Sequence, residues 1–177
     1  MKRILTILIL TLSVPAAFAH TGPQGDDAIN FIRQHYAQIN RSAGLYKKVK
    51  KSLSGFSAEG GELVAYFHGP SVMKMVATYF GESGKASEEF YFWNGKLIFV
   101  LRTDFRYDKP LSGKVVKKTE DRFYFSNDQL IRWIDENAKE VASDRTEYGE
   151  KQKEYLDSSK QLSEGARGKS ATIESNL

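Results

Sequence analysis

Apolar residues near the amino-terminal end of the chain recur with the period of a helix. Spacings of three, four and three positions separate four of them, Ile29, Ile32, Tyr36 and Ile39. Such spacing places the four side chains on one stripe of an amphipathic helix. Asp26 would lie near the positive end of the helix dipole, and Gly44 would end the helix. The pattern predicts a helix from Asp26 to about Ala43.

Strand-like alternation follows in three segments that share one order: a Tyr-Phe pair, one further residue, a two-residue turn and an apolar strand. The three pairs are Tyr66-Phe67, Tyr91-Phe92 and Tyr124-Phe125. Asn94-Gly95 is the strongest turn signal, because both central residues of a type I′ turn need positive φ, and Asn127-Asp128 is a weaker one. Proline cannot adopt positive φ, so the turn at Gly69-Pro70 must be built differently. Three hairpins in series predict an antiparallel meander.

The turn at Asn94-Gly95 also predicts which side chains share a face, since cross-strand partners count outward from the turn. One face would hold Phe90, Phe92, Leu97, Phe99 and Leu101. The other would hold Tyr91, Trp93, Ile98 and Val100. Phenylalanine has no polar group and favours full burial, whereas Tyr and Trp carry an O–H or N–H that needs water or a partner. We therefore expect the phenylalanine face to be the core, covered by the first helix.

The tyrosine face is the candidate functional surface. It would bring together Tyr66, Tyr91, Trp93, Tyr124, Trp133, Met73 and Met75. Aromatic side chains and methionine are enriched at contacts with other molecules. An open face of this kind predicts a binding surface for a protein, a peptide or a glycan of the cell envelope. The alternative is that a C-terminal helix, or the twist of the sheet, covers it.

The last part of the chain is charged and only thinly apolar. Residues 144–165 carry a narrow apolar stripe of Tyr148, Tyr155, Leu156 and Leu162. This predicts a loosely attached helix, and residues 166–177 are expected to form a flexible tail. The fold class expected is α+β: an N-terminal helix packed on a meandering antiparallel sheet of about six strands, with a peripheral C-terminal helix.

Residues 1–19 have the pattern of a signal peptide. Lys2 and Arg3 precede an apolar run that is too short to span a bilayer. The small-x-small pattern of a cleavage site follows at residues 17–19, which are Ala, Phe and Ala. Removal of this segment predicts one domain over residues 20–165. We expect it to be periplasmic or secreted, with no membrane anchor in the mature chain.

Charge and cysteine content narrow the choice of partner. The 177 residues include no cysteine and carry a formal net charge of +4, of which the predicted signal peptide holds two positive charges. The charge is not concentrated as in a nucleic-acid-binding protein, so no nucleic-acid partner is expected. A group of lysines follows Tyr107, namely Lys109, Lys114, Lys117 and Lys118. It predicts a solvated loop, with an acidic partner as the alternative.

No catalytic pattern stands out in the sequence. His20, His35 and His68 include no pair at the spacing of metal ligands. Neither a G-x-S-x-G motif nor a glycine-rich phosphate loop is present. We expect no catalytic residue, no metal and no cofactor. The predicted function is a non-enzymatic exported binding or interaction module that uses the aromatic face, and the alternative is an envelope hydrolase whose site the sequence does not place.

Over about residues 26–135 the chain resembles a widespread group of small exported bacterial proteins of uncharacterised activity, in which tyrosine-rich hairpins with Asn-Gly-Lys turns follow one helix. The likeness rests on FIRQHYAQIN, EGGELVAYF, YFGESGKASEEFYFWNGKLIFV and EDRFYFSNDQLIRWID. More distantly, the form YF-x-N-G-K-L is similar to MORN-type hairpin repeats, although the units here start 25 and then 33 residues apart. The resemblance implies a helix followed by hairpins and supplies no catalytic motif.

Overall fold

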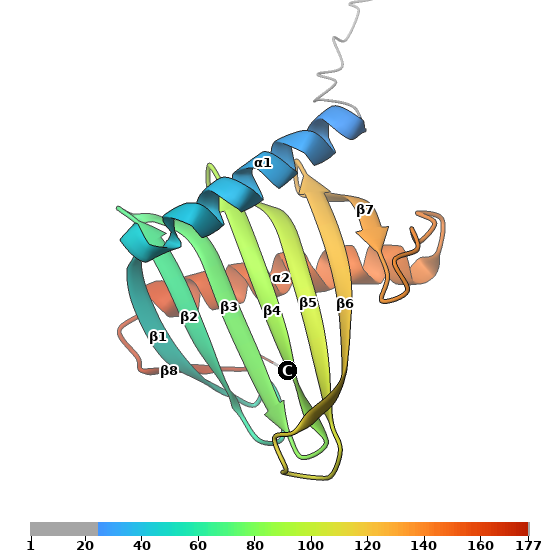
Figure 1. Ribbon diagram of the computed structural model, residues 1–177. Helices are drawn as coiled ribbons and strands as arrows, with labels where there is room; N and C mark the ends of the chain where they lie inside the picture. The colour runs from blue at the N-terminus through green and yellow to red at the C-terminus, as the bar shows by residue number, and fades with distance from the viewer. Residues whose placement is uncertain (1–24, 177) are drawn as a thin grey trace, which may run out of the picture.

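The structure, a computed structural model, describes residues 25–176. One eight-stranded sheet lies between two helices, α1 in front of it and α2 behind (Figure 1). The elements in chain order are α1 (Asp26–Ser42), a 3-10 turn (Ala43–Leu45), β1 (Lys47–Ser54), β2 (Gly61–His68), β3 (Ser71–Gly81), β4 (Gly84–Trp93), β5 (Lys96–Tyr107), β6 (Val115–Ser126), β7 (Gln129–Ile134), α2 (Thr146–Arg167) and β8 (Thr172–Glu174). The α+β class and the antiparallel meander are confirmed, but the sheet has eight strands rather than about six.

The strands β1 to β7 lie in the sheet in sequence order, each antiparallel to the next. The two strands that the pattern did not predict are β1 and β8. β1 reads KKVKKSLS, and its alternation is hidden by Lys51, a buried lysine at an inward position between Val49 and Leu53. β8 pairs in parallel with β1, with Ile173 opposite Leu53. The segment 166–177, expected to be a flexible tail, therefore contains a strand at the edge of the sheet.

The three predicted hairpins are present, with the two-residue turns where the sequence placed them. Asn94 and Gly95 have φ of 49° and 77°, and Asn127 and Asp128 have φ of 51° and 62°, as type I′ turns require. At Gly69-Pro70 only the glycine has positive φ, at 58°. That matches a type II′ turn, in which glycine takes the first central position and proline can take the second.

Each hairpin also contains a β-bulge at the same place, which the sequence did not reveal. The register shifts next to the Tyr-Phe pair, between Tyr66 and Phe67, between Tyr91 and Phe92 and between Tyr124 and Phe125. Phe92 still faces Leu97, but Tyr91 then faces Phe99 instead of Ile98. An extra residue on one strand reverses the alternation beyond it. The three units thus share one geometry as well as one sequence pattern.

The bulges redistribute the side chains that simple counting assigned to the two faces. Phe99 joins Tyr91 on one face, whereas Val100 joins Phe90 on the other. By the same shift, Trp133 faces Phe123 rather than sharing the side of Tyr124. The predicted face assignment was therefore correct up to each bulge and wrong beyond it.

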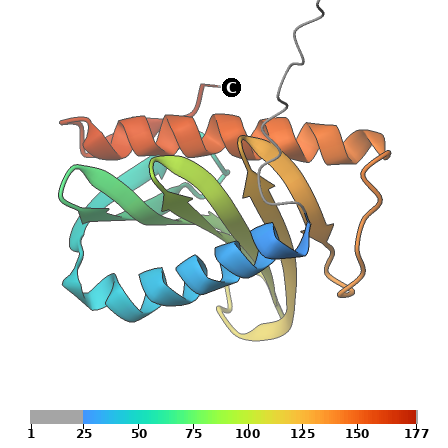
Figure 2. The same cartoon turned by 90° about the horizontal axis from the view of Figure 1, so that it is seen from above.

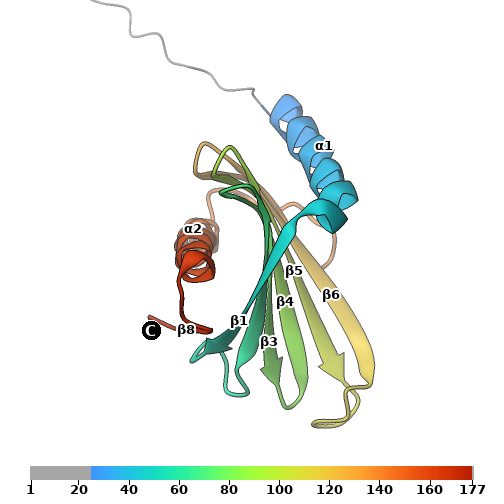
Figure 3. The same ribbon diagram turned by 90° about the vertical axis from the view of Figure 1, so that its left-hand side faces the viewer.

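The two helices cover the faces in the opposite way to the prediction. Ile29, Ile32 and Ile39 of α1 pack in one cluster with Tyr91 and the other buried side chains of the tyrosine face. The phenylalanine face packs against α2 instead, as the views from above and along the sheet show (Figures 2 and 3). α1 crosses its face near the end where the three turns lie and leaves the opposite end uncovered (Figure 3).

The C-terminal helix is not peripheral, contrary to the prediction. The Tyr155 ring lies 4.5 Å from that of Phe123 and 6.2 Å from that of Phe90, measured between centroids. Leu162, about two turns further along α2, is fully buried in the same cluster. At Gly165 a Cβ atom would lie 2.6 Å from Cδ1 of Ile173, so the absent side chain leaves room for β8 against the helix. A thin apolar stripe is enough here, because it consists of large side chains that all face the sheet.

The predicted signal peptide, residues 1–19, lies outside the described residues. Among the residues that are described, no helix is long and apolar enough to cross a membrane.

Candidate functional site

The structure does not bring the seven predicted surface residues together on one open face. Tyr66, Tyr91 and Tyr124 share the α1 side, with Met73 and Trp93 packed against the same cluster, whereas Met75 and Trp133 belong to the α2 side. Tyr91 is 0 % exposed and Tyr124 is also buried, both in the cluster that packs under α1. Tyr91 and Tyr124 are therefore core, covered by α1 and not by the C-terminal helix, whereas Tyr66, Met73 and Trp93 are half-buried.

The tyrosine hydroxyl groups are accommodated beneath α1 by polar partners. The Tyr91 hydroxyl lies 3.1 Å from Oδ1 of Asn40 and also makes a hydrogen bond to the Glu89 carboxylate. The Lys74 ammonium group pairs with Glu89 at 2.7 Å and donates to Asn40 Oδ1 at 3.0 Å. Burial raises the pKa of Tyr91, and the adjacent Glu89 raises it further. The hydroxyl thus stays protonated as part of a satisfied network that joins α1 to the sheet.

Unlike Tyr91 and Tyr124, Trp93 is only half-buried, at the edge of the covered face. Its ring lies 3.8 Å from the His35 ring, and the Phe31 ring lies 3.9 Å from the His35 ring, between centroids. Phe31 is 40 % exposed. Within residues 25–176, the Trp93 indole N–H has no hydrogen-bond acceptor, whereas the Trp133 N–H donates to Asp121 at 2.9 Å. An amphipathic ring is thus presented with its polar group free.

Two hollows flank Trp93. The first, of about 320 Å³, lies between α1 and the turns of the second and third hairpins and is lined by apolar atoms of Phe31, Ile32 and Leu97 among others. The second, of about 500 Å³, lies next to the 3-10 turn that follows α1, and its lining includes Tyr46, His68 and Met73. We call the set formed by Phe31, His35, Tyr46, His68, Met73 and Trp93 the aromatic rim. It holds two of the seven predicted residues, Met73 and Trp93.

The sequence offered one signal for the part of the aromatic rim that was missed. Phe31 and His35 are four positions apart on α1, so they lie one above the other on a helix face. That face is beside the isoleucine stripe, not on it. An aromatic pair next to an apolar stripe indicates a helix that contacts something besides the core. Tyr46 and His68 had no such signal, because their rings approach to 6.0 Å only through the pairing of β1 with β2.

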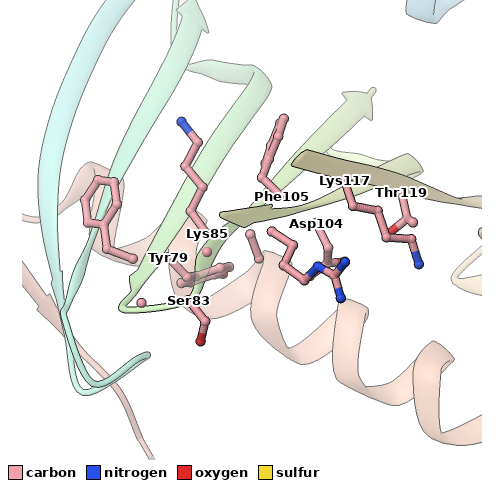
Figure 4. Close-up of a pocket in the computed structure, with 12 residues that line it drawn as sticks. Tyr79, Ser83, Lys85, Asp104, Phe105, Lys117 and Thr119 are labelled. Atoms are coloured by element: carbon pink, nitrogen blue, oxygen red, sulfur yellow. The ribbon is translucent and has the colours of Figure 1, made fainter. Parts of the chain in front are cut away.

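A third hollow, of about 560 Å³, lies at the opposite end of the sheet (Figure 4). Tyr79, Asp104, Lys117 and Thr119 line it where the sheet extends past α2. Two glycines, Gly81 and Gly84, contribute no side chains to its wall. Lys85 and Phe105 also border it, and they point to the side of the sheet away from α2 (Figure 4).

Carboxylates gather next to this hollow around a single cation, Arg102. Its guanidinium group donates to both oxygens of Asp104 at 2.8 and 2.9 Å and to Glu88 at 3.0 Å. The Tyr79 hydroxyl donates to Glu88 at 3.1 Å. The Glu88 side chain is only 6 % exposed. A general acid or base must reach the atom that it protonates or deprotonates, and Glu88 is instead enclosed by its partners.

Burial dominates the electrostatics of Glu88, with a consequence for stability. Desolvation raises the pKa of Glu88 above its ordinary value of 4.5, although Arg102 and Tyr79 act in the opposite direction. The folded state therefore favours the protonated form, and the resulting stability is fully present below about pH 4.5 and is lost as the pH rises through the raised pKa. We expect Glu88→Gln to gain free energy of unfolding relative to the parent chain as the pH rises from 4 to 8, measured by urea denaturation.

Glu120→Gln is the matched control for this pH dependence. The bond from Lys118 lowers the pKa of Glu120, so its stabilisation is present above the ordinary value of 4.5 and is lost as the pH falls through the lowered pKa. The Gln variant should accordingly lose stability relative to the parent chain as the pH rises, and by a small amount because Glu120 is near the surface. If the stabilities of the two variants, relative to the parent chain, changed in the same direction with pH, burial would not control the pKa of Glu88.

Among the residues that the structure describes, no three His, Cys, Asp or Glu side chains are grouped so that they could hold a metal ion. Comparisons of the chain with protein-family models, with curated proteins and with solved structures find no match.

Proposed function

We propose that this protein is an exported, non-enzymatic binding module and that the aromatic rim takes an apolar peptide segment of a protein partner in the cell envelope. The observation that carries the proposal is Trp93, half-buried between two hollows, with an indole N–H that has no acceptor among residues 25–176. Tryptophan is prominent among the residues that dominate binding energy at interfaces, where it is set in a pocket and surrounded by apolar contacts. Export follows from the predicted signal peptide.

The chemistry of the hollows favours a peptide over a glycan. The first hollow is bounded by Phe31, Leu97 and Ile98, so it suits an aliphatic or aromatic side chain. Polar side chains, namely Asn94, Lys96, Ser126 and Asn127, lie on its turn side, but most of its lining surface is apolar, which suits a peptide side chain better than the hydroxyls of a glycan. On the other side of Trp93, the His68 and Tyr46 rings and the Met73 thioether provide adaptable apolar contact. An extended peptide could place one side chain in each hollow and accept a hydrogen bond from the indole N–H.

The hydrolase alternative has less support. Its natural location is the hollow beside Arg102, where Glu88 and Asp104 come together. A pair of carboxylates serves hydrolysis when their pKa values are set apart and both reach the substrate. Here a single guanidinium group binds both, and Glu88 is enclosed. We therefore interpret this network as structural and place the functional surface at the aromatic rim.

The test is a selection from a random peptide library on the chain without residues 1–19. We expect the selected peptides to carry apolar or aromatic side chains and to shift the fluorescence of Trp93 on binding. Trp93→Ala should weaken their binding by about 2 kcal/mol or more, which is about thirtyfold, because truncation of a central Trp costs at least that much. Phe31→Ala should also weaken it, and this substitution on an exposed helix position leaves the core intact.

Val116→Ala is the control for this experiment. Val116 is an exposed apolar residue on β6 and does not line either hollow of the aromatic rim. It should leave peptide affinity unchanged. Peptides that bind the parent chain, Trp93→Ala and Phe31→Ala equally well would place the binding surface elsewhere and overturn the proposal.

A further inference from the structure

The β5–β6 hairpin ends in a loop, residues 108–114, at the end of the sheet farthest from α1 (Figures 1 and 3). Residues 105–118 of this hairpin, here called the basic tip, are unlike the rest of the protein surface. They combine exposed aliphatic side chains with a dense positive charge. The aromatic rim and the basic tip lie at opposite ends of the sheet, so the two features can be tested separately.

Exposed apolar side chains concentrate at this end. Seven large apolar side chains are exposed within residues 25–176, and four of them lie here: Phe80, Leu111, Val115 and Val116. Leu111 at the apex is 72 % exposed and Val116 is 52 % exposed. Single exposed apolar residues are normal on a protein, but a group of them indicates an interaction surface.

The loop holds Leu111 outward in a strained conformation. Its φ is 58°, in the left-handed region that a leucine rarely adopts. Its backbone N–H donates to the carbonyl oxygen of Glu82 at 2.7 Å, and the Ser112 N–H donates to the carbonyl oxygen of Lys109 at 3.2 Å. The backbone is therefore pinned while the side chain faces solvent. An ordered loop that keeps a strained, exposed leucine at its apex is a sign of function rather than of packing.

Positive charge surrounds this apex. The basic tip carries five cationic side chains and one carboxylate, so its net charge equals the +4 of the whole chain. The carboxylate, Asp108, is engaged by Lys114 at 3.3 Å and by the Ser112 hydroxyl at 2.6 Å. Arg106, Lys109 and Lys117 make no ion pair within the described residues. Their charges are free to meet an anionic partner.

The cations lie on both faces of the hairpin. Lys117 lies opposite Arg106 on the side of the sheet that faces α2, and Lys118 lies opposite Phe105 on the other side, where it forms an ion pair with Glu120 at 2.7 Å. Lys85 lies over the Phe105 ring at 5.3 Å and adds another cation to that second side. A projecting apolar apex with positive charge on both sides matches a planar anionic surface.

From this arrangement we infer that the basic tip docks the protein on the surface of a bilayer that contains anionic lipids. Leu111, Val115 and Val116 enter the boundary between head groups and acyl chains, and the lysines meet the lipid phosphates. An acidic protein is the other anionic partner of this chemistry. The hollow lined by Arg106 and Lys117 would suit such a partner, but its lining does not include Leu111, Val115 or Val116. These exposed aliphatic side chains, with Leu111 72 % exposed at the apex, suit insertion into lipid instead.

The experiment measures binding of the chain without residues 1–19 to two kinds of vesicle, phosphatidylcholine with phosphatidylglycerol and phosphatidylcholine alone. We expect binding to the anionic vesicles only, and loss of it at high salt. Lys109→Gln and Lys117→Gln should each lower the affinity about fivefold, which is the effect of one cation at an anionic surface. Leu111→Gly should lower it several-fold while leaving the urea midpoint equal or higher, because glycine tolerates the positive φ.

Lys160→Gln is the matched control, because it removes one exposed lysine of α2 that has no ion pair among the described residues. It should bind vesicles as the parent chain does, and so should Trp93→Ala, whose effect belongs to the aromatic rim alone. Three results would each overturn the inference: no binding to anionic vesicles, equal binding to neutral ones, or unchanged affinity in the Lys109, Lys117 and Leu111 variants. Binding to polyglutamate without binding to vesicles would indicate an acidic protein partner instead.

Discussion

A chain that ends at Asp144 is expected not to fold. Such a truncation removes α2 and β8, and with them the buried side chains of Tyr148, Tyr155, Leu162 and Ile173. At about 1.5–3 kcal/mol for each large side chain, their burial contributes about 6–12 kcal/mol. That is comparable to the whole stability of an ordinary domain, about 5–15 kcal/mol. Circular dichroism and urea titration should show no cooperative transition.

A second truncation, ending at Lys169, provides the control. It keeps α2 but removes β8, so it loses the burial of Ile173 and the hydrogen bond from Lys51 to the carbonyl oxygen of Ser170. The bond from Lys51 to the Gly168 carbonyl oxygen, at 2.8 Å, remains. We expect this chain to unfold cooperatively at a lower urea concentration, with a loss of about 2–5 kcal/mol, as for deletion of one buried aliphatic side chain. Cooperative unfolding of the shorter chain, ending at Asp144, would show that α2 is dispensable after all.

Tyr91→Ala is expected to destabilise the protein as much as Phe92→Ala, by about 3–5 kcal/mol in each case. The two neighbours point to opposite faces of β4, and each face is covered by a helix. Tyr91 is fully buried, and its loss would also leave Asn40 and Glu89 without one partner beneath α1. The measurement is the urea midpoint of each variant with the denaturant slope held in common.

Tyr66→Ala is the comparison that separates burial from residue type. Tyr66 lies on the same face as Tyr91 but is only half-buried, with the Lys48 ammonium group 5.4 Å from its ring centroid. Loss of a cross-strand contact of this kind costs about 0.2–1 kcal/mol. If Tyr91→Ala cost as little stability as Tyr66→Ala, that result would contradict the burial of Tyr91 under α1.

The parts of the fold that were predicted correctly are those with signals inside one short segment. The isoleucine stripe and the acidic first turn were sufficient for α1, which runs from Asp26 to Ser42, within one residue of the expected helix. Asn94-Gly95 and Asn127-Asp128 located two hairpins, because positive φ is a property of the residues themselves. These features need no knowledge of what packs where.

The errors all depend on distant parts of the chain. A bulge does not interrupt the sequence pattern, so the positions of Val100 and Trp133 could not be counted correctly from the turns. Nor does an amphipathic helix specify which face of a two-sided sheet it covers, since both faces of β4 are apolar here. β8 became visible only once its pairing with β1 was known.

Only part of the candidate site could be predicted, because the exposure of a side chain also depends on distant parts of the chain. Trp93 and Met73 were chosen for their residue type, and they lie on the aromatic rim with Phe31 and His35 of α1. The other five chosen residues share that chemistry but lie elsewhere, several of them buried in the core. Residue type indicates what a side chain can contact, while its exposure depends on the helix that covers it. The distinction between Trp93 and Tyr91 therefore required the structure.

The position of α2 after the seven strands of the meander has a consequence for biosynthesis. A ribosome releases the amino-terminal part first, so the seven strands of the meander emerge before the helix that covers the phenylalanine face. Until that helix arrives, Phe90, Phe92, Phe123 and Phe125 have nothing to pack against on their side of the sheet. Exposed apolar sheet surface of this kind makes an incomplete chain prone to aggregate. The phenylalanine face can be covered only after α2 has been made, which favours a chain that stays unfolded until then.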